Sequence, residues 1–374
     1  MTELSNSPAP GFVRISSGVV VNDFHLQNEG EPAIVESGGT AINTTVDHWW
    51  DFYVHGEMSD TIIKKGEIIV ECGGRITNTV IHESSYVEIR SGGTMYHSTI
   101  KAGGGFLIHK GGVVTGIEAE KDAKMSIIVS PDTYVQGASN GSAFEIKDGF
   151  VSNYTVHAGN DLFIVSGGTA ADVTIEKDGL LSVKSGGLAS NIIAQKGAKI
   201  RLEIAPNTFA QGTLNGSKFE VRNGVLSNYN ITSGGKVVVL SGGIVKQLKL
   251  CREGLRLFIN SGGIASGFNV EEGAELIINA APGTFALGVS GGTPIDIKDG
   301  KACGLIINSG CILYVDSGGT ASDIIVDTGG RLVVFRGGSA NHTTICSGGT
   351  MRVLDGGIAY NTTDNNAEGK EKHL

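Results

Sequence analysis

The residues of this chain that could carry out acid–base chemistry most regularly are the aspartates of a recurring Lys-Asp-Gly, namely Asp148, Asp178 and Asp299. A polysaccharide lyase or hydrolase needs two or three carboxylates, or a carboxylate beside Lys or Arg, converging on one face. Asp-Gly is also a common tight-turn sequence, and we interpret these three as turns. No part of the chain carries a cluster that its neighbours lack. We therefore expect no catalytic residues and no enzyme, with a carbohydrate-active enzyme as the alternative.

Metal and cofactor chemistry is also disfavoured. The five cysteines are odd in number and form no C-x-x-C pair, so neither a disulfide framework nor a zinc site is expected. His48 and His55 lie near Asp47 and Asp51 in sequence, but exposed loop histidines are the simpler interpretation. The sequence has no P-loop, H-E-x-x-H or G-x-S-x-G motif, and we expect no metal and no cofactor.

The best local candidate for binding is an aromatic segment that contains Trp49, Trp50, Phe52 and Tyr53. Flat aromatic rings can stack on sugar rings or anchor a protein partner. The alternative is that these rings fill an irregular N-terminal cap. Both tryptophans of the chain lie here, so the segment differs from everything that follows.

The elements that must position these residues come from an internal repeat. The phrase SGGTAINTTV at residues 37–46 returns in related form at 166–175, 185–194, 261–270 and 317–326, on a period of about 19 residues. Its seventh position is almost always Asn, Asp or Gly, as at Asn22, Asn43 and Asn341. The exceptions are His97 and Gln247. Asn, Asp and Gly tolerate left-handed backbone, which indicates a corner.

A longer repeat lies over the short one. Three inserts, each beginning with proline at 131, 206 and 282, are 75 and 76 residues apart. We expect four-rung units of about 75 residues, each with one variant rung, at residues 131–137, 206–212 and 282–288.

Apolar runs of four to six residues lie between glycine corners, as in Leu162–Val165, and they have strand length and β-branched content. One such rung cannot bury its own side chains, but stacked rungs can. The predicted fold is all-β, a single-stranded parallel β-helix (β-solenoid) of about nineteen rungs of about 19 residues. We expect a leader or cap over 1–15, the solenoid over 16–363 with an irregular aromatic insert at 47–56, and a polar tail over 364–374.

Composition excludes several classes of protein. Glycine is high at 57 residues and proline low at 7, which suits short strands with tight corners. The formal net charge is −9 without a polybasic run, so nucleic acid is not an expected partner. No run of 18 apolar residues is present, so no transmembrane segment is expected.

The phrase Ser-Gly-Gly-Thr-Ala-x-Asn-Thr-Thr-Val on a 19-residue period resembles the passenger repeats of self-associating autotransporter adhesins of the diffuse-adherence type, over about residues 16–363. The resemblance implies a passenger at the cell surface or secreted, and adhesion to a host or bacterial receptor or to itself. It also implies O-linked heptose added by a heptosyltransferase, with a purely structural stalk as a further alternative. The candidate O-glycosylation sites are the serines of the phrase: Ser37, Ser91, Ser166, Ser185, Ser241, Ser261 and Ser317.

The family also implies a signal peptide and a C-terminal membrane barrel, and we expect neither in this sequence. Residues 1–11 lack a basic start and an apolar core. An excised passenger, a separately exported passenger and a degenerate copy all fit this pattern.

Overall fold

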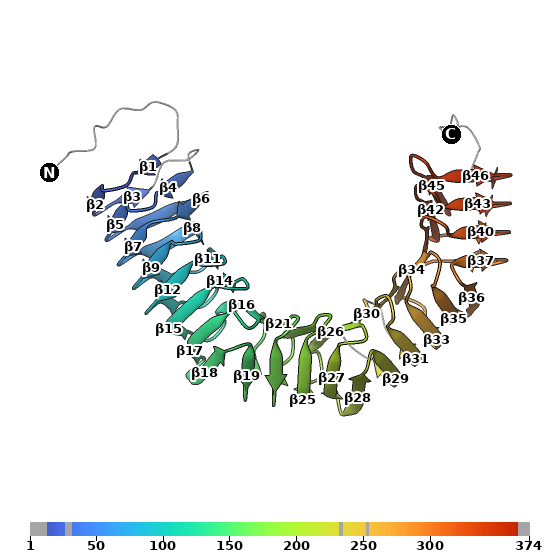
Figure 1. Cartoon of the computed structure of the whole chain (residues 1–374), viewed down its shortest axis with the longest axis horizontal. Helices are drawn as coiled ribbons and strands as arrows, with labels where there is room; N and C mark the ends of the chain where they lie inside the picture. The colour runs from blue at the N-terminus through green and yellow to red at the C-terminus, as the bar shows by residue number, and fades with distance from the viewer. Residues whose placement is uncertain (1–12, 27–31, 232–234, 252–253, 366–374) are drawn as a thin grey trace. The chain divides into compact units, whose positions relative to one another are not determined.

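The computed structural model describes residues 13–26, 32–231, 235–251 and 254–365, and the regular structure of these residues consists of strands (Figure 1). The chain divides into two compact units, an N-terminal unit, Met1–Ala171, and a C-terminal unit, Asp172–Leu374. Each unit is a stack of coils, and each coil contributes up to three short strands. Strands at the same place in successive coils pair side by side, and we call such a stack a strand column.

The N-terminal unit has three strand columns. Its first column contains β1 (Val13–Ile15), β4 (Ala33–Val35), β6 (Thr45–Val54), β8 (Ile62–Val70), β11 (Ser85–Ile89), β14 (Gly105–Ile108), β16 (Lys124–Val129) and β21 (Asp161–Ile164). Its second column contains β2 (Val20–Asn22), β5 (Thr40–Ile42), β7 (Glu57–Ser59), β9 (Arg75–Thr77), β12 (Thr94–Tyr96), β15 (Val113–Ala119), β17 (Tyr134–Ser139), β19 (Phe150–Ser152) and β22 (Thr169–Ala171). Its third column contains β3 (His25–Leu26), β10 (Val80–Ile81), β13 (Thr99–Ile100) and β20 (Thr155–Val156), together with parts of β6, β8, β15 and β17.

The C-terminal unit repeats this plan. Its first column contains β24 (Leu180–Val183), β26 (Lys199–Ile204), β30 (Lys236–Val239), β32 (Arg256–Ile259), β34 (Glu275–Ala280), β39 (Cys311–Val315), β42 (Arg331–Val334) and β45 (Thr350–Val353). Its second column contains β25 (Leu188–Ala194), β27 (Phe209–Leu214), β29 (Val225–Ile231), β31 (Ile244–Leu250), β33 (Ile264–Val270), β35 (Phe285–Ser290), β37 (Lys301–Cys303), β40 (Thr320–Ser322), β43 (Ser339–Asn341) and β46 (Ile358–Tyr360). The shorter third column contains β23 (Thr174–Ile175), β38 (Ile306–Ile307), β41 (Ile325–Val326), β44 (Thr344–Ile345) and β47 (Thr363–Asp364).

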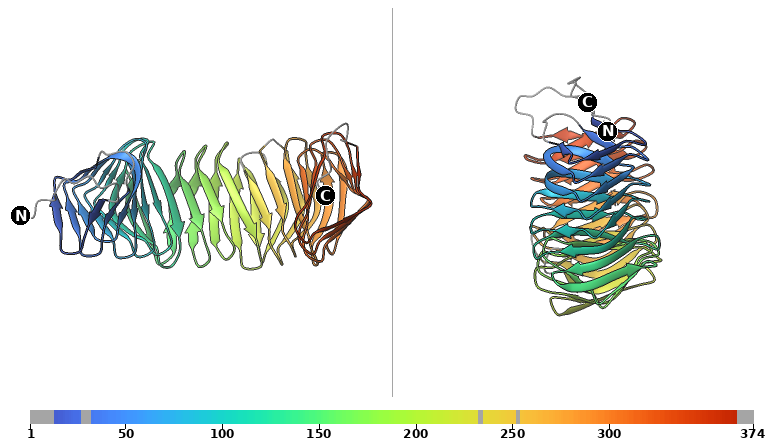
Figure 2. Two further views of the ribbon diagram at one scale, coloured as in Figure 1. Left: turned by 90° about the horizontal axis from the view of Figure 1, so that it is seen from above. Right: turned by 90° about the vertical axis from the view of Figure 1, so that its left-hand side faces the viewer.

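Pairing within the columns is parallel and in register, which confirms the predicted β-solenoid. Met58 pairs with Ile76, and Ile76 pairs with Met95 on the next coil. All three side chains are buried, and burying such a side chain contributes about 1.5–3 kcal/mol. Alternate residues along each strand point inward, so every coil adds one layer to a continuous apolar interior. Figure 2 shows the strands of successive coils lying side by side.

The corners form where the sequence predicts them. In the C-terminal unit, Gly318 has φ +78°, and a Cβ on Gly319 would lie 2.0 Å from the carbonyl oxygen of Ala280. Only glycine fits both positions, the first because of its left-handed backbone and the second because two coils approach closely there.

The Asn/Asp/Gly position is also left-handed, with φ between 47° and 69° at the residues that follow the predicted pattern and also at His97 and Gln247. Two predicted positions are wrong by one residue, because the residue with positive φ is Asp23 rather than Asn22, and His342 rather than Asn341. In both coils the strand of the second column continues through the asparagine, and the chain turns at the following residue.

The three long intervals differ from the expected pairs of rungs. The residues after Pro131 form β17, which pairs in parallel with β15 as a rung should. The chain then turns back into β18 (Ser142–Lys147), which pairs antiparallel with β17 and then with β19. Residues 131–165 therefore make one coil that carries a three-stranded antiparallel meander, and not two coils.

The C-terminal unit contains two further meanders. Their middle strands are β28 (Ser217–Arg222) and β36 (Thr293–Lys298), and each pairs antiparallel with both of its neighbours. Their turns use Asn215-Gly216, Asn223-Gly224, Gly291-Gly292 and Asp299-Gly300, all with positive φ. Such dipeptides favour two-residue hairpins. Asp148 and Asp299 are therefore turn residues, as the sequence predicts.

The meander lengthens one side of the stack. In the N-terminal unit, the second column passes from β15 through β17, β18 and β19 to β22, which is four strand spacings or about 19 Å. The first column covers the same coils from β14 through β16 to β21 in two spacings, or about 10 Å. The meander thus makes the second column longer than the first over the same coils.

Two expected boundaries also differ. The first described strand, β1, begins at Val13, within the expected leader, and pairs with β4, while the last described pairing reaches Asp364, within the expected tail. Residues 1–12 and 366–374 lie outside the described part of the chain. The expected aromatic insert at 47–56 is mostly part of β6, which pairs with β4 and β8 and shifts its register between Val46 and Asp51.

Candidate functional site

The aromatic segment reaches the surface only in part. The Trp49 side chain is 63 % exposed, and Lys65 Nζ lies 4.8 Å from the centre of its ring. Tyr53 is half-buried, and its hydroxyl donates to Asp51 Oδ2 at 3.1 Å. Phe52 is fully buried and meets Phe24 edge-on at 6.4 Å between ring centres. The expectation that Phe52 contacts a ligand is therefore wrong, because its place in β6 points inward. The side chains of Trp50 and His48 lie outside the described part of the chain.

A face of tyrosines and carboxylates lies beside this segment and was not found from the sequence. Asp51, Glu67 and Tyr86 occupy neighbouring positions on β6, β8 and β11. The pKa of the Glu67 carboxyl is raised, first by burial and then by the nearby charges of Asp51 and Glu88. Burial also raises the pKa of Tyr86 to about 12, with Glu67 as the next cause. These residues are far apart in sequence, and only the register of the coils brings them together.

Glu88 is the hub of the same face. Its Oε1 lies 2.8 Å from Arg90 Nε and 3.0 Å from His109 Nε2, and Arg90 also contacts Glu71 at 2.5 Å. Arg90 therefore contacts carboxylates on neighbouring coils, and ion pairs stabilise this face in addition to strand pairing. Among the described residues no group of three or more His, Cys, Asp or Glu side chains is placed to hold a metal ion.

The serines of the repeat line one corner of the coils. Six of the seven candidates are exposed, and Ser185 is half-buried. Three of these serines lie against the glycine of the next coil: a Cβ on Gly111 would lie 2.6 Å from Ser91 Oγ, one on Gly262 would lie 2.7 Å from Ser241 Oγ, and one on Gly337 would lie 2.7 Å from Ser317 Oγ. Proline replaces serine in the coils with meanders, where Pro206 lies against Gly242 in the same way. The hydroxyls thus form an accessible row that the meanders interrupt.

The left-handed corners carry a second row of polar side chains. Asn78 Nδ2 donates to Asp60 Oδ1 at 3.0 Å, and Asn361 Nδ2 donates at 3.0 Å to Oδ1 of Asn341, the residue before the left-handed corner at His342. The side chains on consecutive coils are therefore hydrogen-bonded to each other, and the row presents amides and carboxylates to solvent at the spacing of the strands.

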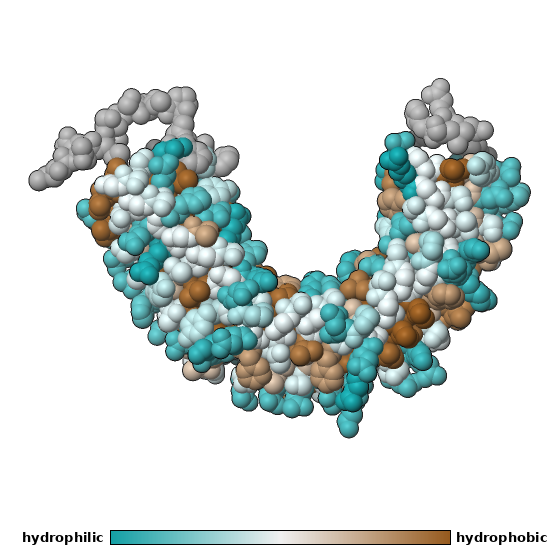
Figure 3. Space-filling model, in the orientation of Figure 1, coloured by the Kyte–Doolittle hydropathy of each residue, from teal (hydrophilic) through white to brown (hydrophobic). Residues whose placement is uncertain are grey.

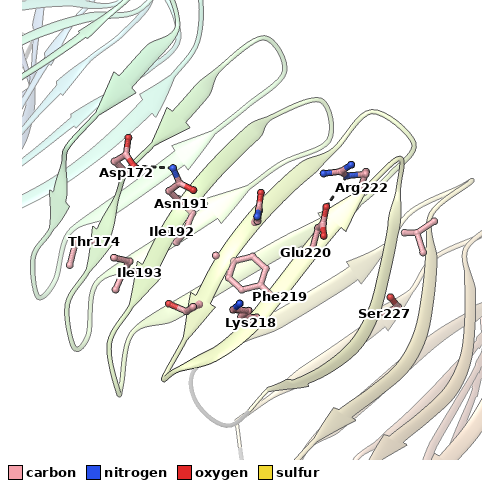
Figure 4. A pocket seen from close by; sticks show the side chains of 14 residues that line it. Asp172, Thr174, Asn191, Ile192, Ile193, Lys218, Phe219, Glu220, Arg222 and Ser227 are labelled. Carbon is pink, nitrogen blue, oxygen red and sulfur yellow. Dashed lines mark hydrogen bonds and ion pairs between the residues drawn. The ribbon is translucent and has the colours of Figure 1, made fainter.

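A hollow with a volume of about 930 Å³ lies beside the first meander of the C-terminal unit (Figure 4). We call it the central groove. One row of outward side chains crosses four paired strands, as Thr174, Ile193, Thr213 and Lys218. The floor between the rows is Gly212, where a Cβ would lie 2.2 Å from the carbonyl oxygen of Ile192. A side chain at this position would push β25 and β27 apart, so glycine keeps the groove open and the strands paired.

The second row of the central groove is more strongly polar. Asn191 Nδ2 donates to Asp172 Oδ1 at 3.0 Å, and Gln211 pairs across the strands with Glu220. Glu220 Oε1 in turn lies 2.7 Å from Arg222 Nε. Figure 4 shows the Asp172–Asn191 and Glu220–Arg222 pairs at opposite ends of the groove. The groove therefore offers amide, hydroxyl and ammonium groups over an open surface rather than an enclosed catalytic pocket.

The rest of the surface is mixed in character. Figure 3 shows apolar residues scattered among polar ones on the face in view. The five cysteines are free; Cys311 is buried, and burial raises its pKa to about 12. No helix long and apolar enough to cross a membrane occurs in the described part of the chain.

Part of the chain matches a known protein family. Residues 136–198 and 290–349 match a family described as "Adhesin of bacterial autotransporter system, probable stalk". Both matched segments begin in a meander strand and continue through the coils after it, which confirms the resemblance of the repeat phrase to autotransporter adhesins over these residues. No curated protein matches the chain. A crystal structure of a TibC-catalysed, hyper-glycosylated fragment of TibA is similar, with 22 % identity over 95 % of this chain and 94 % of that one, and a TM-score of 0.24.

Proposed function

We propose that this chain is an adhesin-like, non-enzymatic passenger, displayed on a bacterial surface or secreted, whose solenoid associates with copies of itself. The observation that supports this most directly is the regular recurrence of outward-facing side chains. In the third column of the C-terminal unit, Ile306, Ile325, Thr344 and Thr363 follow each other on paired strands. Ile306 and Ile325 are each 39 % exposed.

A surface with a fixed pitch can contact a second copy with the same pitch at many points. Each contact between exposed side chains is weak. Because the contacts lie along one rigid stack, the entropy of orientation is lost only once, so their contributions to affinity accumulate. The matched adhesin-stalk segments lie on both units and support the same function.

The test removes single coils without breaking the register. Because Gly318 stacks on Gly337, deletion of residues 318–336 joins Ser317 to Gly337 and restores the phrase Ser-Gly-Gly-Ser-Ala. A second deletion, of residues 337–355, removes the next coil in the same way. Beads coated with the purified chain should clump, and each deletion should reduce the clumping stepwise.

Mixing coated beads with bare beads separates self-association from adhesion to another surface, since only coated pairs should join. Far-ultraviolet circular dichroism of each deletion variant checks that the solenoid remains folded. Unchanged clumping after both deletions, with the fold intact, would show that the repeated surface does not mediate the association.

The serine row supports the further proposal that a heptosyltransferase modifies the chain. The supporting feature is the exposure of Ser37, Ser91, Ser166, Ser241, Ser261 and Ser317 at one corner. Intact-mass measurement of the native protein should show added heptose units, and a native mass equal to that of the unmodified chain would contradict the proposal.

A stalk that presents the aromatic segment is the second candidate, favoured by the exposed Trp49 ring beside Lys65. Trp49→Ala should then abolish binding to cells or receptors while bead clumping persists. Loss of both together, or of neither, would argue against a separate binding segment.

A further inference from the structure

The central groove differs from the corresponding surfaces of its two repeats. At the corner where it has Asn191, the meander of the N-terminal unit has Gly116 and the last meander has Gly267, all three with positive φ. The glycine floor, by contrast, is shared, since Gly137 and Gly288 make the same close contacts with the preceding strand as Gly212 does. All three meanders therefore share the glycine at the floor of the groove, but only the central groove has an amide side chain at this corner.

The first row shows the same difference. Where the central groove has Thr213 and Lys218, the register places Ala138 and Ala143 in the first meander, and Val289 and Pro294 in the last. Side chains that can donate or accept hydrogen bonds thus stand on both sides of the floor in the central groove. Folding does not require Asn191, Thr213 or Lys218, because the other two meanders fold with Gly, Ala, Val or Pro at these positions.

The charges in the groove balance. Glu220 and Arg222 form an ion pair, and Asp172 accepts a hydrogen bond from Asn191. Lys218 is exposed and has no ion-pair partner among the described residues. With two carboxylates and two cations, the lining attracts neither a polyanion nor a polycation, so hydrogen bonding rather than charge selects the ligand.

We propose that the central groove binds a short neutral oligosaccharide laid across β23, β25, β27 and β28. Neighbouring strands are about 4.8 Å apart, close to the length of one pyranose ring, so successive sugars would meet successive strands. Asn191, Gln211, Thr213 and Lys218 supply the amide, hydroxyl and ammonium groups that pair with sugar hydroxyls. Ile193, 57 % exposed between them, offers an apolar surface to the C–H face of a ring.

The affinity should be low. The groove is open, its residues other than Phe219 and Ile192 are at least partly exposed, and Phe219 lies beneath the surface at 4 % exposure. No exposed aromatic ring lines it, so stacking contributes little. We expect dissociation constants on the order of 1 mM, typical of a few solvent-exposed hydrogen bonds.

The test uses the full chain and four hexasaccharides: cellohexaose, maltohexaose, mannohexaose and the charged hexagalacturonate. Saturation-transfer difference NMR should show binding of at least one neutral probe and weaker or no binding of hexagalacturonate. Gln211→Ala and Asn191→Gly should each weaken the binding about fivefold, as expected for one lost hydrogen bond. Asn191→Gly copies the residue type of the other two meanders and suits the left-handed backbone, so the fold should persist.

Gln136→Ala is the matched control, since Gln136 occupies in the first meander the place of Gln211. This variant should bind the probe as tightly as the unaltered chain. The proposal is overturned if no neutral probe binds, if hexagalacturonate binds best, or if Gln211→Ala and Asn191→Gly bind as the unaltered chain does. Bead clumping of Gln211→Ala should be unchanged, which separates this groove from the proposed self-association.

Discussion

The ring of Tyr86 lies against Gly105 on the next coil, in the space that a side chain at position 105 would need. A Cβ built on Gly105 would lie 2.4 Å from Tyr86 Cδ2. The two residues pair directly across β11 and β14, so neither can move away without opening the strands.

Gly105→Ala should therefore destabilise the fold by about 1–3 kcal/mol, the usual penalty of overpacking. Adding Tyr86→Ala should remove the clash, so the double variant should be more stable than the sum of the two single effects predicts. Chemical denaturation of the four proteins measures the coupling. Simple additivity would mean that the ring is free to leave its place.

Tyr229→Phe should stabilise the C-terminal unit. The Tyr229 side chain is 1 % exposed, and its hydroxyl has no hydrogen-bond partner among the described residues. Burying this hydroxyl costs desolvation free energy that no hydrogen bond offsets. Removing it should raise the free energy of unfolding by about 1 kcal/mol, measured by thermal or urea unfolding. Tyr154→Phe in the first meander is the matched control and should gain less, because the Tyr154 hydroxyl, unlike that of Tyr229, either reaches solvent or has a hydrogen-bond partner. Equal gains in both would refute the reasoning.

The same substitution should change alkaline unfolding. Burial raises the pKa of Tyr229 above its ordinary value of about 10. The folded chain then holds this proton more tightly than the unfolded chain, so the contribution to stability is complete below pH 10 and declines as the pH rises above it. Tyr229→Phe should therefore unfold at a higher pH than the unaltered chain in a circular-dichroism titration. An unchanged midpoint would indicate that the hydroxyl ionises in place.

Glu67→Gln should stabilise the N-terminal unit at pH 7. The pKa of Glu67 is raised by burial and by Asp51 and Glu88, so the folded state favours the protonated carboxyl. The charged carboxylate therefore destabilises the folded state at neutral pH, and this destabilisation disappears as the pH falls through the raised pKa. The difference in melting temperature between Glu67→Gln and the unaltered chain should accordingly shrink from pH 7 to pH 4. A difference that grew on acidification would contradict the sign.

The corner at Asn78 separates backbone strain from hydrogen bonding. Its φ is 52°, and its side chain donates to Asp60. Asn78→Val should destabilise by about 1–3 kcal/mol, because a β-branched residue strains left-handed backbone. Asn78→Gly should lose the hydrogen bond alone and destabilise by less than about 1 kcal/mol. Urea unfolding of both variants gives the order, and a glycine variant less stable than the valine variant would reverse the explanation.

Each meander behaves in sequence as a removable insertion of 16 residues. Deleting residues 137–152 joins Gln136, in the second column, to Asn153 at the left-handed corner. The coil from Pro131 to Ser166 then has the ordinary 19-residue spacing. We expect a cooperative thermal transition and a strand-dominated far-ultraviolet spectrum. Aggregation or a loss of cooperativity would mean that the meander is needed to hold the neighbouring coils.

The sequence by itself determined the solenoid and its corners. The left-handed backbone of the corners selects glycine at Gly318 and asparagine at Asn78. Each coil buries only one face of its strands, and this selects alternating apolar residues such as Ile76. These are local constraints that repeat, so they are visible at every period. Asn140-Gly141 also indicates a hairpin turn, and together with the predicted turn at Asp148-Gly149 it bounds a six-residue strand.

Only the tertiary structure decided which coils face each other across those meanders. Ser126 pairs with Asp161, 35 residues later, because the intervening chain folds back on itself instead of adding a coil. That choice depends on the competition between a local hairpin and a distant coil. The hairpin of β27 and β28 places Gln211 and Lys218 around one groove with Asn191. Away from the meanders, the parallel register brings Glu67 beside Asp51 and Tyr86, and β6 turns Phe52 into the core. Such neighbours are fixed by the register of stacked strands, which no short stretch of sequence contains.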